Sequence, residues 1–174
     1  RSGWCTYNGD HMSMYAVNAS IPKTLVRYLV ETYAEAMQEQ GRLDIAAVLR
    51  DICATPVSPE LLPPKDNGEI AQITEDSIGS YDYHDFFLYH MLRNGYAPAK
   101  ILELACIAFG TEKREAIINT MQTFYRRFFS QQFKRNCLPD GVKIGSICLS
   151  PRGDWRMPSD ASAALWLRQV AALK

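Results

Sequence analysis

Apolar residues recur three or four positions apart through most of this sequence, and glycine or proline interrupts each run. The first run, between Ser20 and about Gln40, carries Leu25, Leu29, Tyr33, Ala36 and Met37. This spacing places the apolar side chains on one face of a helix. Ser20 is an expected N-cap, Pro22 fits the first turn, and Gly41 is an expected stop. A chain built from such runs is constrained to a mainly helical fold.

Further segments show the same pattern with their own stop signals. Three of them are 43–53 before Pro56 and Pro59, 80–94 before Gly95, and 99–109 between Pro98 and Gly110. A long helix is expected within 111–136, capped by Thr111 and running to about Arg135. A last helix, capped by Ser159 or Asp160, is expected to run to Leu173 within the C-terminal segment 150–174. The long helix presents an apolar face of Ile118, Met121, Tyr125, Phe128 and Phe129. We interpret this stripe as core or subunit interface rather than a cofactor site. The run from Val142 to Leu149 is rich in β-branched residues and is the one candidate strand.

Two segments show neither the 3.6-residue apolar period of a helix nor the two-residue period of a strand, and they are expected to be loops. Residues 1–20 mix Gly, Asn, Asp and aromatic residues, which favours a structured loop. Residues 55–79 hold four prolines and several acids. A loop of that length inside a compact domain is usually functional or mobile, although a plain linker remains the alternative. No other shift in composition marks a second domain, so we expect 1–174 to be a single, partial domain.

Composition excludes several classes of protein. Lys and Arg together number 19, as do Asp and Glu, so the net charge is zero and no global field favours nucleic acid or an anionic membrane. The apolar runs are too short to cross a bilayer and no secretory pattern is present, which indicates a cytoplasmic protein. The five cysteines and three histidines are scattered without metal-ligand spacing, so no metal site is expected. The start at Arg1 within a loop-like stretch points to a fragment.

Three places carry residues of types that bind ligands or take part in catalysis. Asp10 beside Gly9 suits hydrogen bonds from ribose or an amine, but also suits a simple turn. Lys134 and Arg135 lie where a helix is expected to end, so they either complement the helix dipole or neutralise a phosphate or carboxylate. The stretch 150–158 alternates arginines and an aspartate around Gly153 and Trp155, which favours fixed charge pairs that bind a ligand or pin the last helix.

Taken together, several stretches resemble one family, the glutamine-dependent NAD+ synthetases. They are GWCTYNGD at 3–10, NASIPK at 18–23, TPVSPEL at 55–61, and residues 128–139 running into SPRGDWRMPSD at 150–160. The resemblance covers essentially the whole chain. It implies the C-terminal helical part of an α/β, adenine-nucleotide-hydrolase-like synthetase domain with a parallel sheet.

The resemblance also implies a reaction and a set of binding residues. In that family the nicotinate carboxylate of deamido-NAD+ attacks ATP, pyrophosphate leaves, and ammonia from an N-terminal glutaminase domain displaces AMP. Residues matched to deamido-NAD+ binding are Trp4, Cys5, Thr6, Tyr7, Asp10 and Lys134. Lys23 and Ser58 would face ATP, and 55–79 would be the mobile loop that closes over both ligands. Mg2+ and cationic side chains are needed where two polyanions meet.

The sequence departs from the family pattern in ways that limit its expected activity. The Ser-Gly-Gly-x-Asp-Ser loop for pyrophosphate is missing, as are the metal-binding carboxylates and the amidase domain with its cysteine nucleophile. The chain alone is therefore expected to be inactive, with no catalytic residue of its own, and Cys5 is not that nucleophile. A homo-oligomer is implied by the resemblance. The alternatives are a catalytically silent helical oligomerisation module and a nucleic-acid binder using Arg126, Arg127, Lys134 and Arg135, which the zero net charge disfavours.

Overall fold

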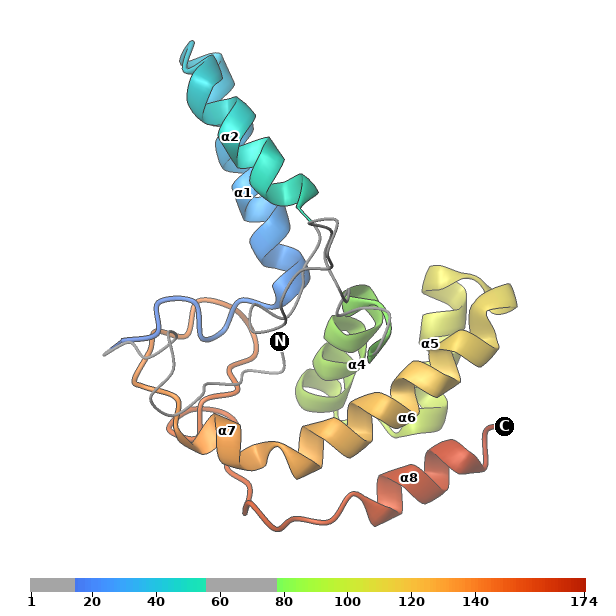
Figure 1. Ribbon diagram of the computed structural model, residues 1–174. Helices are drawn as coiled ribbons and strands as arrows, with labels where there is room; N and C mark the ends of the chain where they lie inside the picture. The colour runs from blue at the N-terminus through green and yellow to red at the C-terminus, as the bar shows by residue number, and fades with distance from the viewer. Residues whose placement is uncertain (1–14, 56–77) are drawn as a thin grey trace, which may run out of the picture. The chain divides into compact units, whose positions relative to one another are not determined.

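The computed structural model describes residues 15–55 and 78–174. These residues belong to two compact units: residues 15–22 with 81–174 form the first, and residues 23–55 with 78–80 form the second. The regular structure of the described residues is entirely helical (Figure 1). The prediction of a mainly α fragment is thereby confirmed for this part of the chain, while the parallel sheet of a larger domain stays a prediction.

The second unit is a hairpin of two helices, α1 (Lys23–Glu39) and α2 (Leu43–Ala54), which pack along each other (Figure 1). Both helices match the sequence prediction. Gly41 lies between them at a φ of +77°, a left-handed conformation that glycine adopts without strain. The expected N-cap was wrong: α1 begins one residue after Pro22, and the Ser20 hydroxyl accepts hydrogen bonds from the distant residues Ile144 and Gly145 instead.

The first unit is built around α6 (Arg114–Ser130), which contacts three other helices. These are α4 (Tyr81–Asn94), α5 (Pro98–Phe109) and α8 (Ala164–Ala171). All five residues of the predicted apolar face of α6 are buried in the core of this unit. The aromatic stripe is therefore core, as one of the two sequence interpretations held.

The expected single helix over 111–136 is divided into three parts. A 3-10 turn, η1 (Thr111–Lys113), precedes α6, and a short helix, α7 (Gln132–Asn136), follows it after a break at Gln131. Thr111 makes no capping hydrogen bond. At the break, the guanidinium of Arg135 donates to the main-chain oxygen of Phe128, one of the last carbonyls of α6. A side chain thus satisfies a carbonyl that the end of the helix leaves without a main-chain donor.

The segment between α7 and α8 corrects two further predictions. Residues 142–149 form no strand, and three of their amides donate to side chains instead: Ile144 and Gly145 to Ser20, and Cys148 to Asp154. The last helix begins at Ala164, so neither Ser159 nor Asp160 caps it. Ser159 instead accepts a hydrogen bond from Asn136 of α7.

Candidate substrate-binding site

Lys134, the matched residue with a described position in the first unit, lies in the middle of α7. It is neither fully buried nor fully exposed, and its ammonium lies 5.9 Å from the centroid of the Phe133 ring. The carbonyl of Lys134 lies 3.1 Å from the thiol of Cys137, which donates to it. The helix that carries this cation is short, so its orientation depends on the contacts that hold α7.

Arg135 supplies several of those contacts. Its side chain is fully buried, its Nε donates to Gln132 Oε1 at 2.7 Å, and its guanidinium lies 4.2 Å from the centroid of the Phe128 ring. Burial lowers the pKa of Arg135 to about 10, so the guanidinium is still protonated at neutral pH. Since it is enclosed by protein, Arg135 braces α7 against α6. Of the adjacent cations Lys134 and Arg135, only Lys134 has a side chain that solvent reaches.

Two further hydrogen bonds involve side chains of α7, one within the helix and one to a residue outside it. Gln132 Nε2 donates to Asn136 Oδ1 at 3.1 Å, and Asn136 Nδ2 donates to Ser159 Oγ at 2.7 Å. The second bond ties α7 to the segment that leads into α8. Residues Gln132 and Arg135 are both completely buried. Lys134 therefore belongs to a helix that Arg135 ties to α6 and Asn136 ties to the segment before α8, and a fixed support is what a binding cation needs.

The loop after α7 is held by the arginine and aspartate of the SPRGDWR stretch. Arg152 pairs with Asp140 at 2.8 Å, and Lys143 pairs with Asp154 at 2.6 Å. The hydrogen bond from Lys143 lowers the pKa of Asp154. Trp155, from the same stretch, packs its ring 5.2 Å from the Phe128 ring. The fixed charge pairs expected of this stretch are present, but their partners Asp140 and Lys143 lie in the loop after α7, so a role in pinning the last helix or in binding a ligand stays a prediction.

The described end of the predicted substrate loop lies against that same loop. The amide of Ala16 donates to the carbonyl of Asp140 at 2.7 Å, and Ser20 Oγ accepts from the amides of Ile144 and Gly145 at 2.8 and 3.1 Å. Thus the chain that leads from Asp10 and the chain that leads from Lys134 meet at residues 140–145.

The other residues predicted to bind deamido-NAD+ or ATP lie outside the first unit or outside the described residues. Lys23 is the first residue of α1 and belongs to the second unit. The remaining six lie outside the described residues; they are Trp4, Cys5, Thr6, Tyr7, Asp10 and Ser58. The mobile loop predicted over 55–79 also falls mostly outside them, so its role stays a prediction.

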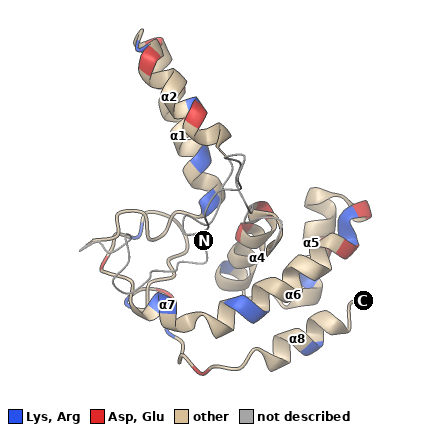
Figure 2. Ribbon diagram, viewed as in Figure 1, with Lys and Arg blue, Asp and Glu red and all other residues tan. Residues whose placement is uncertain are grey.

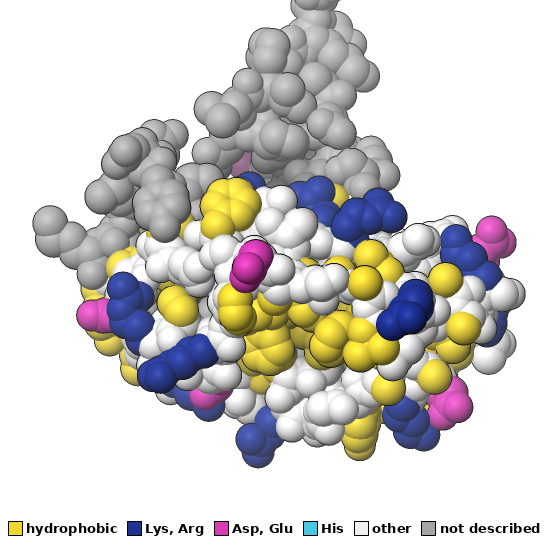
Figure 3. Space-filling view, turned by 90° about the horizontal axis from the view of Figure 1, so that it is seen from below, with side chains coloured by type: hydrophobic (Ala, Val, Ile, Leu, Met, Phe, Trp, Pro, Cys, Tyr) yellow, Lys and Arg dark blue, Asp and Glu magenta, His cyan; other side chains and the backbone are white. Residues whose placement is uncertain are grey.

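The segment that forms α6 and α7 carries more basic than acidic residues, although the chain as a whole is neutral. Between Arg114 and Asn136 five basic residues accompany one acidic residue, Glu115. Figure 2 shows basic positions in blue along α6 and on α7. The surface seen from below in Figure 3 has a band of hydrophobic side chains with lysines and arginines around it and fewer acidic groups. A positive region of this kind attracts anions locally without any net charge on the chain.

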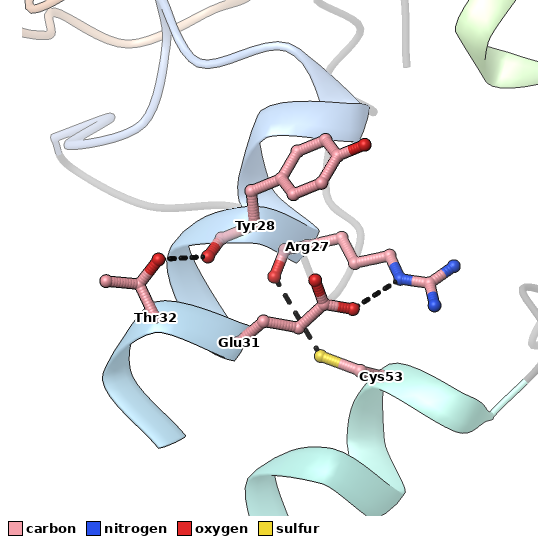
Figure 4. A network of polar contacts seen from close by, with 5 residues as sticks. All are labelled: Arg27, Tyr28, Glu31, Thr32 and Cys53. Carbon is pink, nitrogen blue, oxygen red and sulfur yellow. Dashed lines mark hydrogen bonds and ion pairs between the residues drawn. The ribbon is translucent and has the colours of Figure 1, made fainter. Parts of the chain in front are cut away.

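The hairpin carries its own polar contacts on α1 (Figure 4). Arg27 Nε donates to Glu31 Oε1 at 2.8 Å, and this neighbour raises the pKa of Arg27. Thr32 Oγ1 donates to the carbonyl of Tyr28 at 2.8 Å, and the Cys53 thiol of α2 lies 4.0 Å from the carbonyl of Arg27. These are i to i+4 contacts of a helix surface plus one cross-helix contact, so they describe a solvated face rather than a binding site.

The described residues form neither a cluster of metal-ligand side chains nor a membrane-spanning helix. Residues 15–55 and 78–174 bring together no group of three or more His, Cys, Asp or Glu side chains that could hold a metal ion. In the same part of the chain, no helix is long and apolar enough to cross a membrane.

Comparison with known proteins identifies the relatives of this sequence. No family model matches. The glutamine-dependent NAD(+) synthetase of Mycobacterium leprae is 40% identical over 97% of this chain, and those of Mycobacterium bovis and Mycobacterium tuberculosis are 38% identical over the same share. This chain is therefore similar, over nearly its whole length, to part of a glutamine-dependent NAD(+) synthetase. It spans 27% of the length of each of these relatives. The resemblance that the sequence motifs indicated is confirmed.

Several residues that shape the region around Lys134 were not predicted from the sequence. Ser20 was assigned to a helix cap, which does not predict its hydrogen bonds with the amides of Ile144 and Gly145. The pairing of Lys143 with Asp154 joins residues eleven positions apart across an irregular loop, and such pairs have no periodic signal. The two-sided bracing of α7 was equally invisible. The resemblance to NAD(+) synthetases covers these segments, but it does not indicate which of their residues stabilise the local structure.

Proposed function

We propose that this chain supplies part of the deamido-NAD+ site of a glutamine-dependent NAD+ synthetase. The observation that carries the proposal is the 38–40% identity with enzymes of that name over 97% of the chain. The braced position of Lys134 and the local excess of basic residues are compatible with an anionic substrate.

The proposed reaction converts a carboxylate into an amide. The nicotinate carboxylate attacks the α-phosphorus of ATP, the bond to pyrophosphate breaks, and the carboxylate becomes an acyl adenylate. Ammonia released from glutamine then attacks the acyl carbon, and AMP departs with the electron pair of the acyl–oxygen bond. Adenylation is needed because a free carboxylate is a poor electrophile. A homo-oligomeric assembly and the use of Mg2+ belong to the same proposal.

Lys134 has the clearest role among the described residues. We assign its ammonium to the nicotinate or phosphate end of deamido-NAD+, where a compact charge lowers the repulsion between two polyanions. Trp4, Cys5, Thr6, Tyr7 and Asp10 are proposed to line the rest of that site, with Lys23 and Ser58 toward ATP. The described residues hold no acidic cluster that fits Mg2+, so its ligands are proposed to lie elsewhere in the complete enzyme.

The test is a Lys134→Ala substitution in the complete synthetase. Loss of a charge that contacts the substrate is expected to raise the KM for deamido-NAD+ at least about tenfold. The rate of glutamine hydrolysis should be retained, since that chemistry belongs to another domain. Lys100→Ala is the matched control, because Lys100 is an exposed helical lysine of α5 whose partner is Glu103. Unchanged synthesis in Lys134→Ala would contradict the proposed role.

A second candidate function is a helical oligomerisation module without catalysis. The aromatic stripe of α6 does not favour it, because those side chains are buried within the chain. The hairpin does favour it, since Leu25, Tyr28, Leu29 and Tyr33 of α1 are each 43% or more exposed. This candidate predicts a stable oligomer with no affinity for deamido-NAD+, so titration with that dinucleotide separates the two functions.

A further inference from the structure

Helix α7 is too short to hold its own direction. It comprises five residues, Gln132–Asn136, and it follows the break at Gln131. Helices of that length are unstable in water, because the few hydrogen bonds they form do not offset the cost of nucleation. The direction of α7 is therefore set by the contacts that its side chains make with the rest of the first unit.

Arg135 makes such contacts with the last turn of α6 and within α7. Its Nε donates to Gln132 Oε1 at 2.7 Å. Its guanidinium donates to the carbonyl of Phe128 and lies 4.2 Å from the centroid of the Phe128 ring. The guanidinium is planar, and its donors have fixed directions. One side chain therefore fixes both the place of α7 beside Phe128 and the rotation of α7 about its own axis.

The ring that contacts Arg135 is itself held in the core of the first unit. Phe128 is fully buried, and its ring centroid lies 5.7 Å from that of Phe124 and 5.2 Å from that of Trp155. A close-packed core leaves such a ring few alternative positions. The group to which α7 is attached is therefore rigid.

Lys134 is the neighbour of Arg135 in this helix. Successive side chains of a helix differ in direction by about 100°. Arg135 is accordingly fully buried, whereas solvent reaches the side chain of Lys134. The main chain of Lys134 is held as well, since its amide donates to the carbonyl of Gln131 at 3.1 Å and its carbonyl accepts from the Cys137 thiol at 3.1 Å. The position of α7 thus determines the point from which the Lys134 ammonium extends.

We infer that Arg135 is a positioning residue for deamido-NAD+ binding, which acts by holding the main chain of Lys134 in place. This inference rests on the proposed function and deepens it. Arg135 is fully enclosed, so the neighbouring ammonium and not the guanidinium meets the anionic group of the substrate. The attraction between two charges falls with their separation, so a displacement of α7 weakens binding although the ammonium is still present. The two adjacent cations therefore have separate tasks, one in the fold and one in the site.

The test is a double-mutant cycle in the complete synthetase, with the Kd for deamido-NAD+ and the Kd for ATP measured by calorimetry. Arg135→Met removes the guanidinium and keeps a long side chain. The substitution is made in the wild type and in Lys134→Ala, so that an effect transmitted through Lys134 is separated from a general one. The melting temperature of each protein is recorded.

Arg114→Met is the matched control. The Arg114 guanidinium also donates to a main-chain carbonyl of the first unit, that of Leu173, at 2.7 Å. Arg114 is the first residue of α6, about 21 Å along the helix axis from Phe128. That separation exceeds the screening length of about 10 Å, so loss of this charge should not reach Lys134.

The effect of Arg135→Met should depend on whether Lys134 is present. In the wild type we expect the Kd for deamido-NAD+ to rise about tenfold and the Kd for ATP to change by less than about twofold. In Lys134→Ala the same substitution should change the deamido-NAD+ Kd by less than about twofold, because the group that Arg135 positions is gone. Arg114→Met should change neither Kd in either background.

A conservative variant decides the question if Arg135→Met does not fold. Arg135→Lys keeps a positive charge and a donor, but it loses the planar fork that contacts Gln132 and Phe128 together. We expect it to raise the deamido-NAD+ Kd about threefold in the wild type and to leave that Kd unchanged in Lys134→Ala.

Two outcomes would overturn the inference while sparing the proposed function. One is an unchanged Kd for deamido-NAD+ in the folded Arg135 variants while Lys134→Ala raises it. The other is a rise in the Lys134→Ala background as large as that in the wild type, which would mean that Arg135 acts independently of Lys134. An unchanged Kd in Lys134→Ala itself would refute the proposed role of Lys134, so the two failures are distinguishable.

Discussion

The two compact units bury their apolar residues to very different extents. In the first unit, Phe87, Phe124 and Phe128 form successive ring contacts at 5.6 and 5.7 Å, and Trp155 continues the series. In the hairpin only Ala34, Met37 and Ala46 are buried. Helical periodicity predicted helices in both regions. The difference teaches that the pattern determines where a helix forms, whereas the neighbours available determine which of its apolar residues leave water.

The same contrast has a consequence for the proposed site. Lys134 belongs to the unit with the aromatic core, and Arg135 connects its helix to the Phe128 ring. A rigid support is what a binding residue requires. Lys23 belongs to the hairpin, whose large apolar residues are mostly exposed. We therefore expect perturbations of the core to affect deamido-NAD+ binding more than equivalent perturbations of the hairpin.

The largest effect is expected from Phe128→Ala. Its fully buried ring contacts Phe124, Trp155 and the Arg135 guanidinium, so truncation leaves a cavity and removes the support of α7. The expected loss of unfolding free energy is about 3–5 kcal/mol. Chemical denaturation followed by far-ultraviolet circular dichroism measures it. A loss below about 1 kcal/mol would show that the aromatic series is not the core of this unit.

A smaller effect is expected from Met37→Ala in the hairpin. Met37 is 8% exposed and is the largest buried side chain between α1 and α2. We expect a loss of about 2 kcal/mol, the lower end for such a truncation, because few surrounding atoms define a cavity. The deamido-NAD+ affinity should remain unchanged. A loss as large as that of Phe128→Ala would remove the contrast between the two units.

The smallest effect is expected from Asp154→Asn, and it should depend on pH. The pKa of Asp154 is lowered below its ordinary value of 3.8, chiefly by the hydrogen bond from Lys143. A lowered folded-state pKa means that the stabilisation is present above the ordinary value and is lost as the pH falls through the folded-state value. Because both partners are more than a third exposed, the difference from wild type at pH 7 should be at most about 1 kcal/mol.

Thermal unfolding of both proteins between pH 2 and pH 7 measures this effect. The two melting curves should approach each other as the pH falls below the ordinary pKa. A difference that grows on acidification would have the wrong sign and would contradict the assigned pair.

The sequence allowed α1, α2, α4 and α5 to be predicted with nearly correct bounds, because 3.6-residue periodicity and glycine or proline stops are local signals. It did not reveal the break at Gln131, since that depends on Arg135 turning back to the Phe128 carbonyl. The strand expected over 142–149 was wrong for a similar reason. Its amides bind Ser20 and Asp154, which are remote in sequence or hidden in an irregular loop. Motif resemblance made Lys134 a candidate binding residue, and the contacts around α7 show how its helix is held.

The most direct test of this account is a calorimetric titration of deamido-NAD+ into the complete synthetase, with wild type and Lys134→Ala compared under the same conditions. We predict saturable binding by the wild type and a Kd raised at least about tenfold by the substitution. Equal affinities in the two proteins, with both folded, would contradict the claim that Lys134 binds the dinucleotide.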